Sequence, residues 1–160
     1  MRNSLEYDLI IVGSGLAGLR ATIQAARRNS KIRIGVISKV QVMRSHSVSA
    51  EGGTAAVLFP DEGDSIESHI YDTVKGSDFL ADQDAAERLC KEIPDEIYQL
   101  EHWGMPWSRR EDGKIGQRAF GGIVFPGRHM LLTKLDFSKC KHCMIHAKNL
   151  ITLNFLTSGL

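Results

Sequence analysis

The sequence predicts an α/β fold that begins as the N-terminal part of a Rossmann-like domain with a parallel sheet. Three observations support this prediction. An apolar run over residues 7–12 is typical of a strand, and a glycine-rich turn over residues 13–18 follows it directly. A helical pattern over 16–28 then leads into a second apolar run over 31–38. Such a strand–helix–strand unit should place the two strands side by side and parallel, with a right-handed crossover.

Each element of this unit has its own local signal. The run from Tyr7 to Val12 is rich in β-branched residues, so we expect a strand buried on both faces. Gly13 ends it. The following helix carries Arg27 and Arg28 in its last turn, where cations complement the helix dipole. Its apolar face consists of Leu16, Leu19, Ile23 and Ala26.

The rest of the chain is less regular. Residues 40–60 are rich in small side chains, and such a long irregular stretch is typical of a ligand-binding loop. Residues 64–102 have a helical pattern, in which we expect Pro94 to open a new helix rather than lie inside one. Asp112-Gly113 predicts a tight turn. The predicted buried stripe of the helical region consists of Ala86, Leu89, Cys90, Ile93, Ile97 and Leu100.

Composition restricts the class of protein. The chain has 160 residues, 42% hydrophobic and 24% charged, with a net charge of +1. These values are ordinary for a globular domain and give no electrostatic case for nucleic acid. No apolar run approaches the roughly 18 residues of a membrane span, and the first strand begins too early for a signal peptide, so we expect a cytoplasmic chain. Three cysteines without a disulfide framework favour a reducing compartment.

The glycine turn has the chemistry of a dinucleotide site. Gly13 would allow the tight turn, Gly15 the approach of a pyrophosphate, and Gly18 close packing of the helix on the strand. A turn of this kind without any ligand is the structural alternative. Ser38-Lys39 replaces the acidic residue that usually binds a ribose hydroxyl after the second strand, and Lys39 alone would favour a 2′-phosphate.

A second motif narrows the cofactor. Residues 43–53 read Met-Arg-Ser-His-Ser-Val-Ser-Ala-Glu-Gly-Gly, which places His46 among small residues just downstream of the glycine turn. With this motif the chain resembles the flavoprotein subunit of succinate dehydrogenase and fumarate reductase. The other matching stretches are Asp8 to Gly13, Ile37 to Lys39, Gln99 to Gly104, Pro106 to Arg110, and Arg118 with Phe120 to Gly122.

The resemblance implies an FAD-dependent oxidoreductase that interconverts succinate and fumarate by hydride transfer at flavin N5. It implies a covalent bond from His46 to the 8α carbon of FAD, and a tethered flavin has the raised reduction potential that a poor hydride donor such as succinate needs. Ser38-Lys39 resembles what this family has at the end of the second strand, so the absence of the usual ribose-binding acid there agrees with the resemblance. The implied cofactor-binding residues are Gly13, Ser14, Gly15, Leu16, Ala17, Gly18, Ile37, Ser38, Lys39, Ser45, His46, Ser47, Val48, Ser49, Ala50, Glu51, Gly52 and Gly53.

Single residues refine this assignment. His46 argues against L-aspartate oxidases, which resemble the same fold but lack this histidine and hold FAD noncovalently. Within this resemblance Glu51 favours fumarate reductase, because many succinate dehydrogenases have a glutamine at this position. One residue does not decide the direction of catalysis, so both directions are kept as hypotheses. Phe120 is a candidate substrate-site residue, although Ala119 stands where the family often has proline. Trp103 and Trp107 are expected to be core or interface anchors rather than catalytic groups.

The resemblance also implies partners. The intact chain would be the catalytic subunit of a complex with an iron–sulfur subunit and membrane-anchor subunits, peripheral on the inner face of the cell membrane. Its substrate would be a dicarboxylate. The proton-shuttle arginine and the groups that bind the carboxylates would lie beyond residue 160, so no catalytic residue is assigned.

The resemblance stops after Pro126. Taken literally, Cys140, Cys143 and the neighbouring histidines have zinc-ligand spacing, but four ligands this close would hardly surround one ion tetrahedrally. Shifting the reading frame by one base allows residues 127–146 to be re-read as a segment similar to the family's continuation, Arg-Ala-Thr-Tyr-Ala-Ala-Asp-Lys-Thr-Gly-Phe. We therefore predict a frameshift in or next to the Pro126 codon, and no metal site.

We therefore expect residues 1–126 to be the N-terminal part of an FAD-binding domain and residues 127–160 to be an out-of-frame tail without an evolved fold. Three hypotheses for the function follow. In the first hypothesis, an intact frame gives a succinate or fumarate oxidoreductase. In the second, the chain is a small nucleotide- or metal-binding module with a Cys/His tail. In the third, it is a nonfunctional fragment with unpaired sheet edges and a half-built core.

Overall fold

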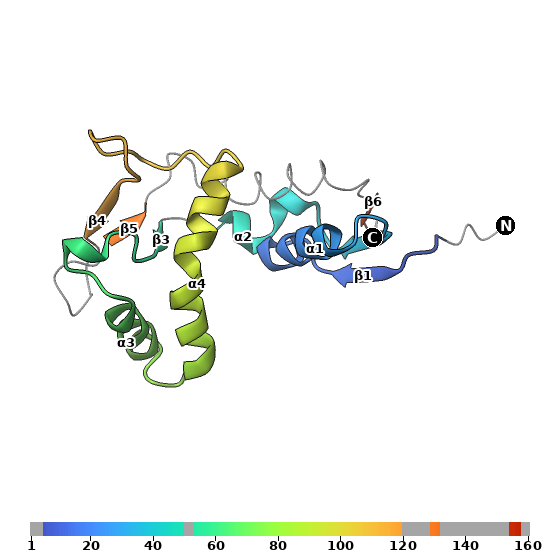
Figure 1. Cartoon of the computed structure of the whole chain (residues 1–160). Coiled ribbons are helices and arrows are strands. Elements are labelled where there is room, and N and C mark those ends of the chain that lie inside the picture. Colours follow the sequence, from blue (N-terminus) through green and yellow to red (C-terminus); the bar gives the residue numbers. More distant parts are fainter. Residues whose placement is uncertain (1–4, 50–52, 120–128, 132–153, 158–160) are drawn as a thin grey trace. The chain divides into compact units, whose positions relative to one another are not determined.

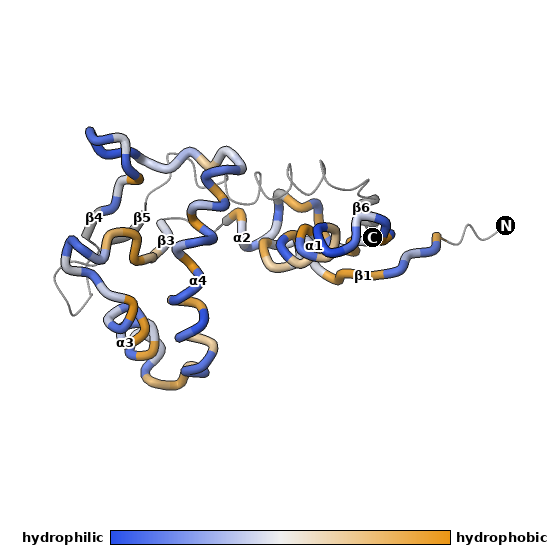
Figure 2. Tube along the Cα trace, viewed as in Figure 1, coloured by the Kyte–Doolittle hydropathy of each residue, from blue (hydrophilic) through white to orange (hydrophobic). Residues whose placement is uncertain are grey.

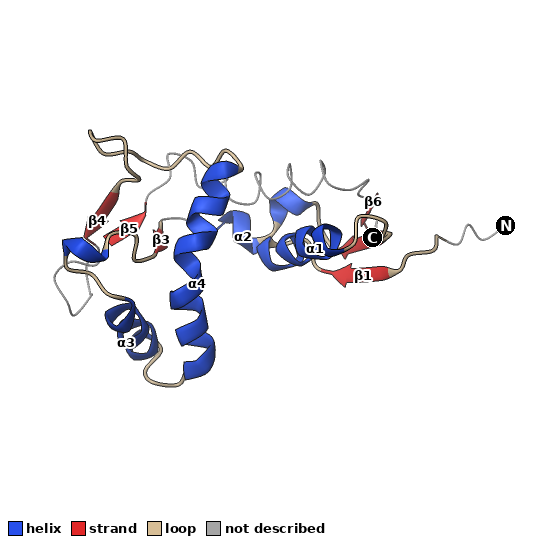
Figure 3. Ribbon diagram, viewed as in Figure 1, coloured by secondary structure: helices blue, strands red, loops and turns tan. Residues whose placement is uncertain are grey.

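The computed structural model describes residues 5–49, 53–119, 129–131 and 154–157. The chain divides into two compact units, one formed by Met1–Glu51 with Leu135–Leu160 and the other by Gly52–Lys134. Figure 1 gives the order of the elements along the chain, and Figure 3 separates the helices from the strands. Each unit combines helices with a three-stranded sheet, parallel in the first and antiparallel in the second.

The first unit contains a parallel sheet. Strand β1 (Leu9–Val12) leads into helix α1 (Leu16–Arg28) and strand β2 (Ile34–Ser38). The sheet order is β1-β2-β6, with β6 at Asn154–Thr157. β1 and β2 are parallel in register from Leu9 opposite Ile34 to Val12 opposite Ile37, and β2 and β6 are also parallel. The predicted strand–helix–strand unit and its parallel pairing are confirmed.

Helix α1 covers one face of this sheet. Ala26 packs with the buried Ile34 and Val36, and the partly buried Leu9 and Ile11 of β1 join them. The helix buries Leu19, Thr22, Ile23 and Ala26, which includes three of its four predicted apolar positions, while Leu16 is partly buried. Burial of this apolar stripe, rather than helix propensity, is what stabilises a helix of this length.

The prediction that the first strand is buried on both faces is wrong. The side chains of β1 alternate, and the two that point away from α1, Ile10 and Val12, are 44% and 83% exposed. Ile37, the register partner of Val12, is 37% exposed. Figure 2 shows the apolar residues of β1 as one continuous orange stretch. The composition is that of a strand covered twice, but α1 covers only one face.

The second unit combines two helices with an antiparallel sheet. Its helices are α3 (Ile66–Gly76) and α4 (Gln83–His102), and its sheet has the order β3-β5-β4, with β3 at Thr54–Ala55, β4 at Gln117–Ala119 and β5 at His129–Leu131. Both helices begin at capping residues. The Ser65 hydroxyl accepts from the Ser68 N–H and the Asp82 carboxylate from the Ala85 N–H, as N-caps do.

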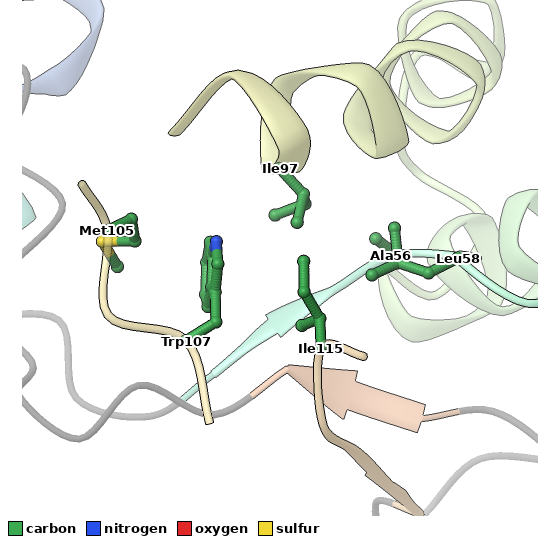
Figure 4. Close-up of a cluster of buried hydrophobic side chains, with 6 residues drawn as sticks. All are labelled: Ala56, Leu58, Ile97, Met105, Trp107 and Ile115. Atoms are coloured by element: carbon green, nitrogen blue, oxygen red, sulfur yellow. The ribbon is translucent and has the colours of Figure 1, made fainter. Parts of the chain in front are cut away.

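The core of the second unit lies between α4 and the segments on either side of it in the sequence. Figure 4 shows Ile97 of α4 pointing toward Trp107 and Ile115. Trp107 is 3% exposed, which confirms its prediction as a core anchor, whereas Trp103 is only partly buried. The Asp112-Gly113 turn is also confirmed, since Gly113 has φ +81° and donates to the Arg110 carbonyl at 3.0 Å. The buried members of the cluster are Ala56, Leu58, Ile97, Met105, Trp107 and Ile115.

Two predictions for the helical region are wrong. Pro94 lies inside α4 rather than at the start of a new helix. Proline removes one backbone hydrogen bond there, but Cys90 and Ile97 on either side are fully buried, so packing holds the helix continuous. Leu89 is 55% exposed and does not belong to the buried stripe, which contains Ala86, Cys90 and Ile97.

The described parts of the 40–60 stretch, residues 40–49 and 53–60, are irregular, as predicted, apart from short elements. These are the single-turn helices η1 (Val42–Arg44) and α2 (His46–Ser49) and the two-residue strand β3. A further single turn, η2, follows at Pro60–Glu62. Within the described ranges, no helix is both long enough and apolar enough to cross a membrane.

Candidate functional site

The candidate site is built around the turn between β1 and α1. Gly13 has φ +108°, in the left-handed region that favours glycine, and its N–H donates to the Ile37 carbonyl at 2.8 Å. This hydrogen bond continues the pairing of β1 and β2 into the turn. The turn therefore begins where the two strands end, at the edge of the sheet where α/β folds bind ligands.

Gly18 performs the packing role predicted for it. A Cβ at this position would lie 2.0 Å from the carbonyl oxygen of Gly13 and 3.5 Å from the Ile11 side chain. Helix α1 therefore approaches the end of β1 more closely than any residue with a side chain would allow. Only glycine lets the first turn of the helix sit directly over the strand.

The N-terminus of α1 can receive an anion. Gly15 is its N-cap, in an extended conformation, and no side chain caps it from that position. The first turn contains no acidic residue. Backbone N–H groups without helical partners, together with the positive end of the helix dipole, attract phosphate at such a terminus.

A hydrogen bond joins this turn to the end of the second strand. The Ser14 hydroxyl, which is buried, donates to the Ser38 hydroxyl at 2.7 Å. Ser38 is thus held next to the glycine turn, in the place where the dinucleotide pattern usually has an acid. Lys39 follows it and is exposed. The structure brings the predicted Ser14 and Ser38 into one site.

The histidine segment, which is the described part of the 43–53 motif (residues 43–49), lies against the same turn. The N–H of Leu16, the first residue of α1, donates to the Ser47 hydroxyl oxygen at 3.2 Å. His46 begins the short helix α2 and is exposed, whereas Val48 is 4% exposed. The imidazole is therefore accessible, while the two residues that follow it are held, Ser47 by its hydrogen bond and Val48 by burial.

Gly15 has a role that the sequence did not reveal. A Cβ at this position would lie 3.2 Å from the Ser47 hydroxyl oxygen and 3.9 Å from Cβ of Ser45. We predicted this glycine to admit a pyrophosphate, and that remains a prediction. The structure adds close contact with the histidine segment. No local signal could have shown this contact, because its partners are 30 or more residues away.

Other predicted site residues are placed differently. Ile37 is the penultimate residue of β2 and its carbonyl accepts from the Gly13 N–H, while Leu16 and Ala17 open α1. Ser49 is the last residue of α2. Gly53 belongs to the second unit. Ala50, Glu51, Gly52 and Phe120, together with Cys140 and Cys143, lie outside the described residues.

An ion pair lies at the other end of the same two strands. The Arg33 side chain donates to the Asp8 carboxylate through Nε at 3.2 Å and Nη2 at 2.9 Å, and the Arg33 N–H donates at 2.9 Å. These hydrogen bonds lower the pKa of Asp8 to about 2. Asp8 therefore stays charged at the start of β1, whereas the glycine turn is at the end of that strand.

Comparisons with known proteins identify the family. The model that describes the FAD-binding domain matches residues 8–151. The chain belongs to the FAD-binding domain family. It is 52% identical over 144 residues to the fumarate reductase flavoprotein subunit of Escherichia coli K12, covering 84% of this chain and 24% of that one. It is 51% identical over 117 residues to the succinate dehydrogenase flavoprotein subunit of Coxiella burnetii, covering 73% of this chain and 20% of the other.

Solved structures agree with this assignment. The FrdA chain of an E. coli quinol fumarate reductase superposes with a TM-score of 0.85 at 41% identity, covering 96% of this chain and 26% of that chain. The chain thus spans about a fifth to a quarter of the length of the relatives it matches. The resemblance to succinate dehydrogenase and fumarate reductase flavoproteins is confirmed, and both names occur among the relatives.

Proposed function

We propose that this chain is the N-terminal part of a flavoprotein subunit that interconverts succinate and fumarate, with FAD bonded to His46. The observation that carries the proposal is the meeting of two segments. The glycine turn at the start of α1 and the histidine segment contact each other through Leu16 and Ser47, in a chain about half identical to fumarate reductase flavoproteins.

The residues present fit FAD. The start of α1 offers backbone N–H groups without an opposing acid, which suits the pyrophosphate. Ser38, held by Ser14 at the end of β2, can serve the ribose end of the cofactor through its hydroxyl. Exposed His46 can bond to the ring. When bound, FAD supplies the two-electron chemistry of dicarboxylate oxidation and reduction.

The groups that act on the dicarboxylate are a separate part of the proposal. The arginine proton shuttle and the residues that bind the carboxylates belong to later parts of an intact subunit, and Phe120 is our candidate from this segment. In such a subunit, electrons pass to an iron–sulfur partner, and anchor subunits hold the complex on the inner face of the cell membrane. The relatives of known structure include a quinol fumarate reductase and a mycobacterial Sdh1 complex, which supports this assembly.

The test is a His46→Ser variant of the whole flavoprotein subunit, expressed with its partners. We expect wild-type flavin to stay on the polypeptide after acid denaturation and the variant to release it. Because loss of the tether lowers the reduction potential of the flavin, succinate oxidation should fall more than fumarate reduction. Wild-type protein that releases all its flavin in acid would contradict the covalent bond, and wild-type protein without flavin would contradict the proposed function.

A further inference from the structure

The contact between the glycine turn at the start of α1 and the histidine segment depends on a particular residue from each of them. Leu16 is the first residue of α1, and its N–H has no helical partner, so it needs an acceptor from elsewhere. The Ser47 hydroxyl, 31 residues along the chain, accepts it at 3.2 Å. Gly15 next to it leaves just enough room, because a Cβ there would meet the same hydroxyl at 3.2 Å.

Backbone hydrogen bonds hold residues 42–48, which flank His46, in place. The Ser45 N–H donates to the Val42 carbonyl at 3.2 Å, and the Val48 N–H donates to the Ser45 carbonyl at 3.0 Å. Val42 and Val48 are buried, at 3% and 4% exposure, while the His46 side chain between them is exposed. The backbone of His46 is therefore fixed relative to the α1 N-terminus through its neighbour Ser47.

This connection matters for covalent attachment. A flavin whose phosphates lie at the start of α1 has its ring at a set distance from that point, and the imidazole must reach the 8α carbon at bonding distance. A misplacement of about 1 Å can slow a positioned reaction by about a hundredfold. We propose that Ser47, with the space that Gly15 leaves, is the positioning residue that aligns His46 for flavin attachment. This inference rests on the proposed function.

The attachment step balances without a further group from the protein. A bond forms between an imidazole nitrogen of His46 and the 8α carbon, while a C–H bond at 8α and the imidazole N–H bond break. The two electrons and two protons released end on the flavin, which becomes reduced. Dioxygen would then take the two electrons and the two protons, leaving as hydrogen peroxide and returning the flavin to its oxidised form. Ser47 takes no part in these bonds and acts only through position.

The experiment compares Ser47→Ala with Ser47→Thr in the whole subunit. Cells are grown so that attachment is incomplete, and covalent and acid-released flavin are measured separately over time. We expect Ser47→Ala to attach flavin about tenfold or more slowly while still binding it noncovalently, and Ser47→Thr, which keeps the hydroxyl, to attach it nearly as fast as wild type. Thr22→Val is the matched control, because it removes another hydroxyl, one that donates within α1 to the Gly18 carbonyl at 2.7 Å.

A double-variant cycle separates the two roles of Gly15. If Gly15 makes room for Ser47, then Gly15→Ala should slow attachment strongly in the wild-type background and much less in the Ser47→Ala background. Equal effects in the two backgrounds would assign Gly15 to the cofactor alone and overturn its proposed role of making room for Ser47. Covalent attachment in Ser47→Ala at the wild-type rate would overturn the positioning role, even if wild-type protein is fully flavinylated and the proposed function stands.

Discussion

Replacement of Gly18 by alanine should disrupt the site from within the fold. The added Cβ would lie 2.0 Å from the carbonyl oxygen and 3.0 Å from the carbonyl carbon of Gly13, both of them backbone atoms. Real Cβ contacts lie beyond 3.0 Å, so α1 must move away from the end of β1 by about 1 Å.

The magnitude follows from two opposed terms. Overpacking against backbone costs about 3 kcal/mol, the upper end of the usual range, since no side chain can rotate away. Alanine regains about 1 kcal/mol of helix propensity over glycine. The net destabilisation is therefore about 2 kcal/mol, and the movement also separates Leu16 from Ser47, so flavin binding should weaken in parallel.

A matched control is available in the other unit. Gly76 ends α3 with no atom within 4 Å of an added Cβ, so Gly76→Ala should be neutral or stabilising by up to about 1 kcal/mol. The assay is thermal unfolding of the whole flavoprotein subunit, with flavin content measured on the same samples. If Gly18→Ala unfolds at the temperature of Gly76→Ala and carries as much flavin, the close approach of α1 to β1 is refuted.

Three further predictions concern charge, the open face and the reading frame. Hydrogen bonds from Arg33 lower the pKa of Asp8 to about 2 from 3.8, so this pairing stabilises the fold fully above about pH 4 and is lost as the pH falls toward 2. In an acid titration of stability, Asp8→Asn should lack this step. A titration that the variant leaves unchanged would contradict the pairing. Val12 is 83% exposed on the face of β1 that α1 does not cover, so Val12→Lys should make the 160-residue chain less prone to self-association, as measured by light scattering. Leu19→Lys, at a fully buried position, should instead unfold the chain. Equal behaviour of the two variants would contradict the exposure of this face. Sequencing the genomic DNA across the codons for Val124 to Thr133 should reveal a one-base shift of frame, and an in-frame sequence would contradict the origin we propose for residues 127–160.

Local signals in the sequence predicted some elements closely. The bounds predicted for the first helix, 16–28, are those of α1, because the glycine turn and the terminal arginines mark its two ends. The two strands were also located, although they begin at Leu9 and Ile34, two and three residues later than their apolar runs. Gly18 was assigned its packing role correctly for the same reason, since its contacts lie within the motif.

Features that depend on distant parts of the chain were not predictable in this way. Pro94 stays inside α4 because tertiary packing outweighs a missing hydrogen bond. The exposure of Val12 depends on what covers the second face of the sheet, which the composition of the strand does not specify. The contact of Gly15 with Ser47 joins segments some thirty residues apart. β6, at residues 154–157, pairs with β2 within the segment that we propose is out of frame.

The central claim is the bond between His46 and FAD. Its most direct test is mass spectrometry of proteolytic peptides from the wild-type whole flavoprotein subunit. We predict one peptide, the one that contains His46, to be heavier by the mass of FAD less two hydrogens, with fragmentation placing the addition on the imidazole. Recovery of that peptide only in its unmodified form, from protein that carries stoichiometric flavin, would contradict the account.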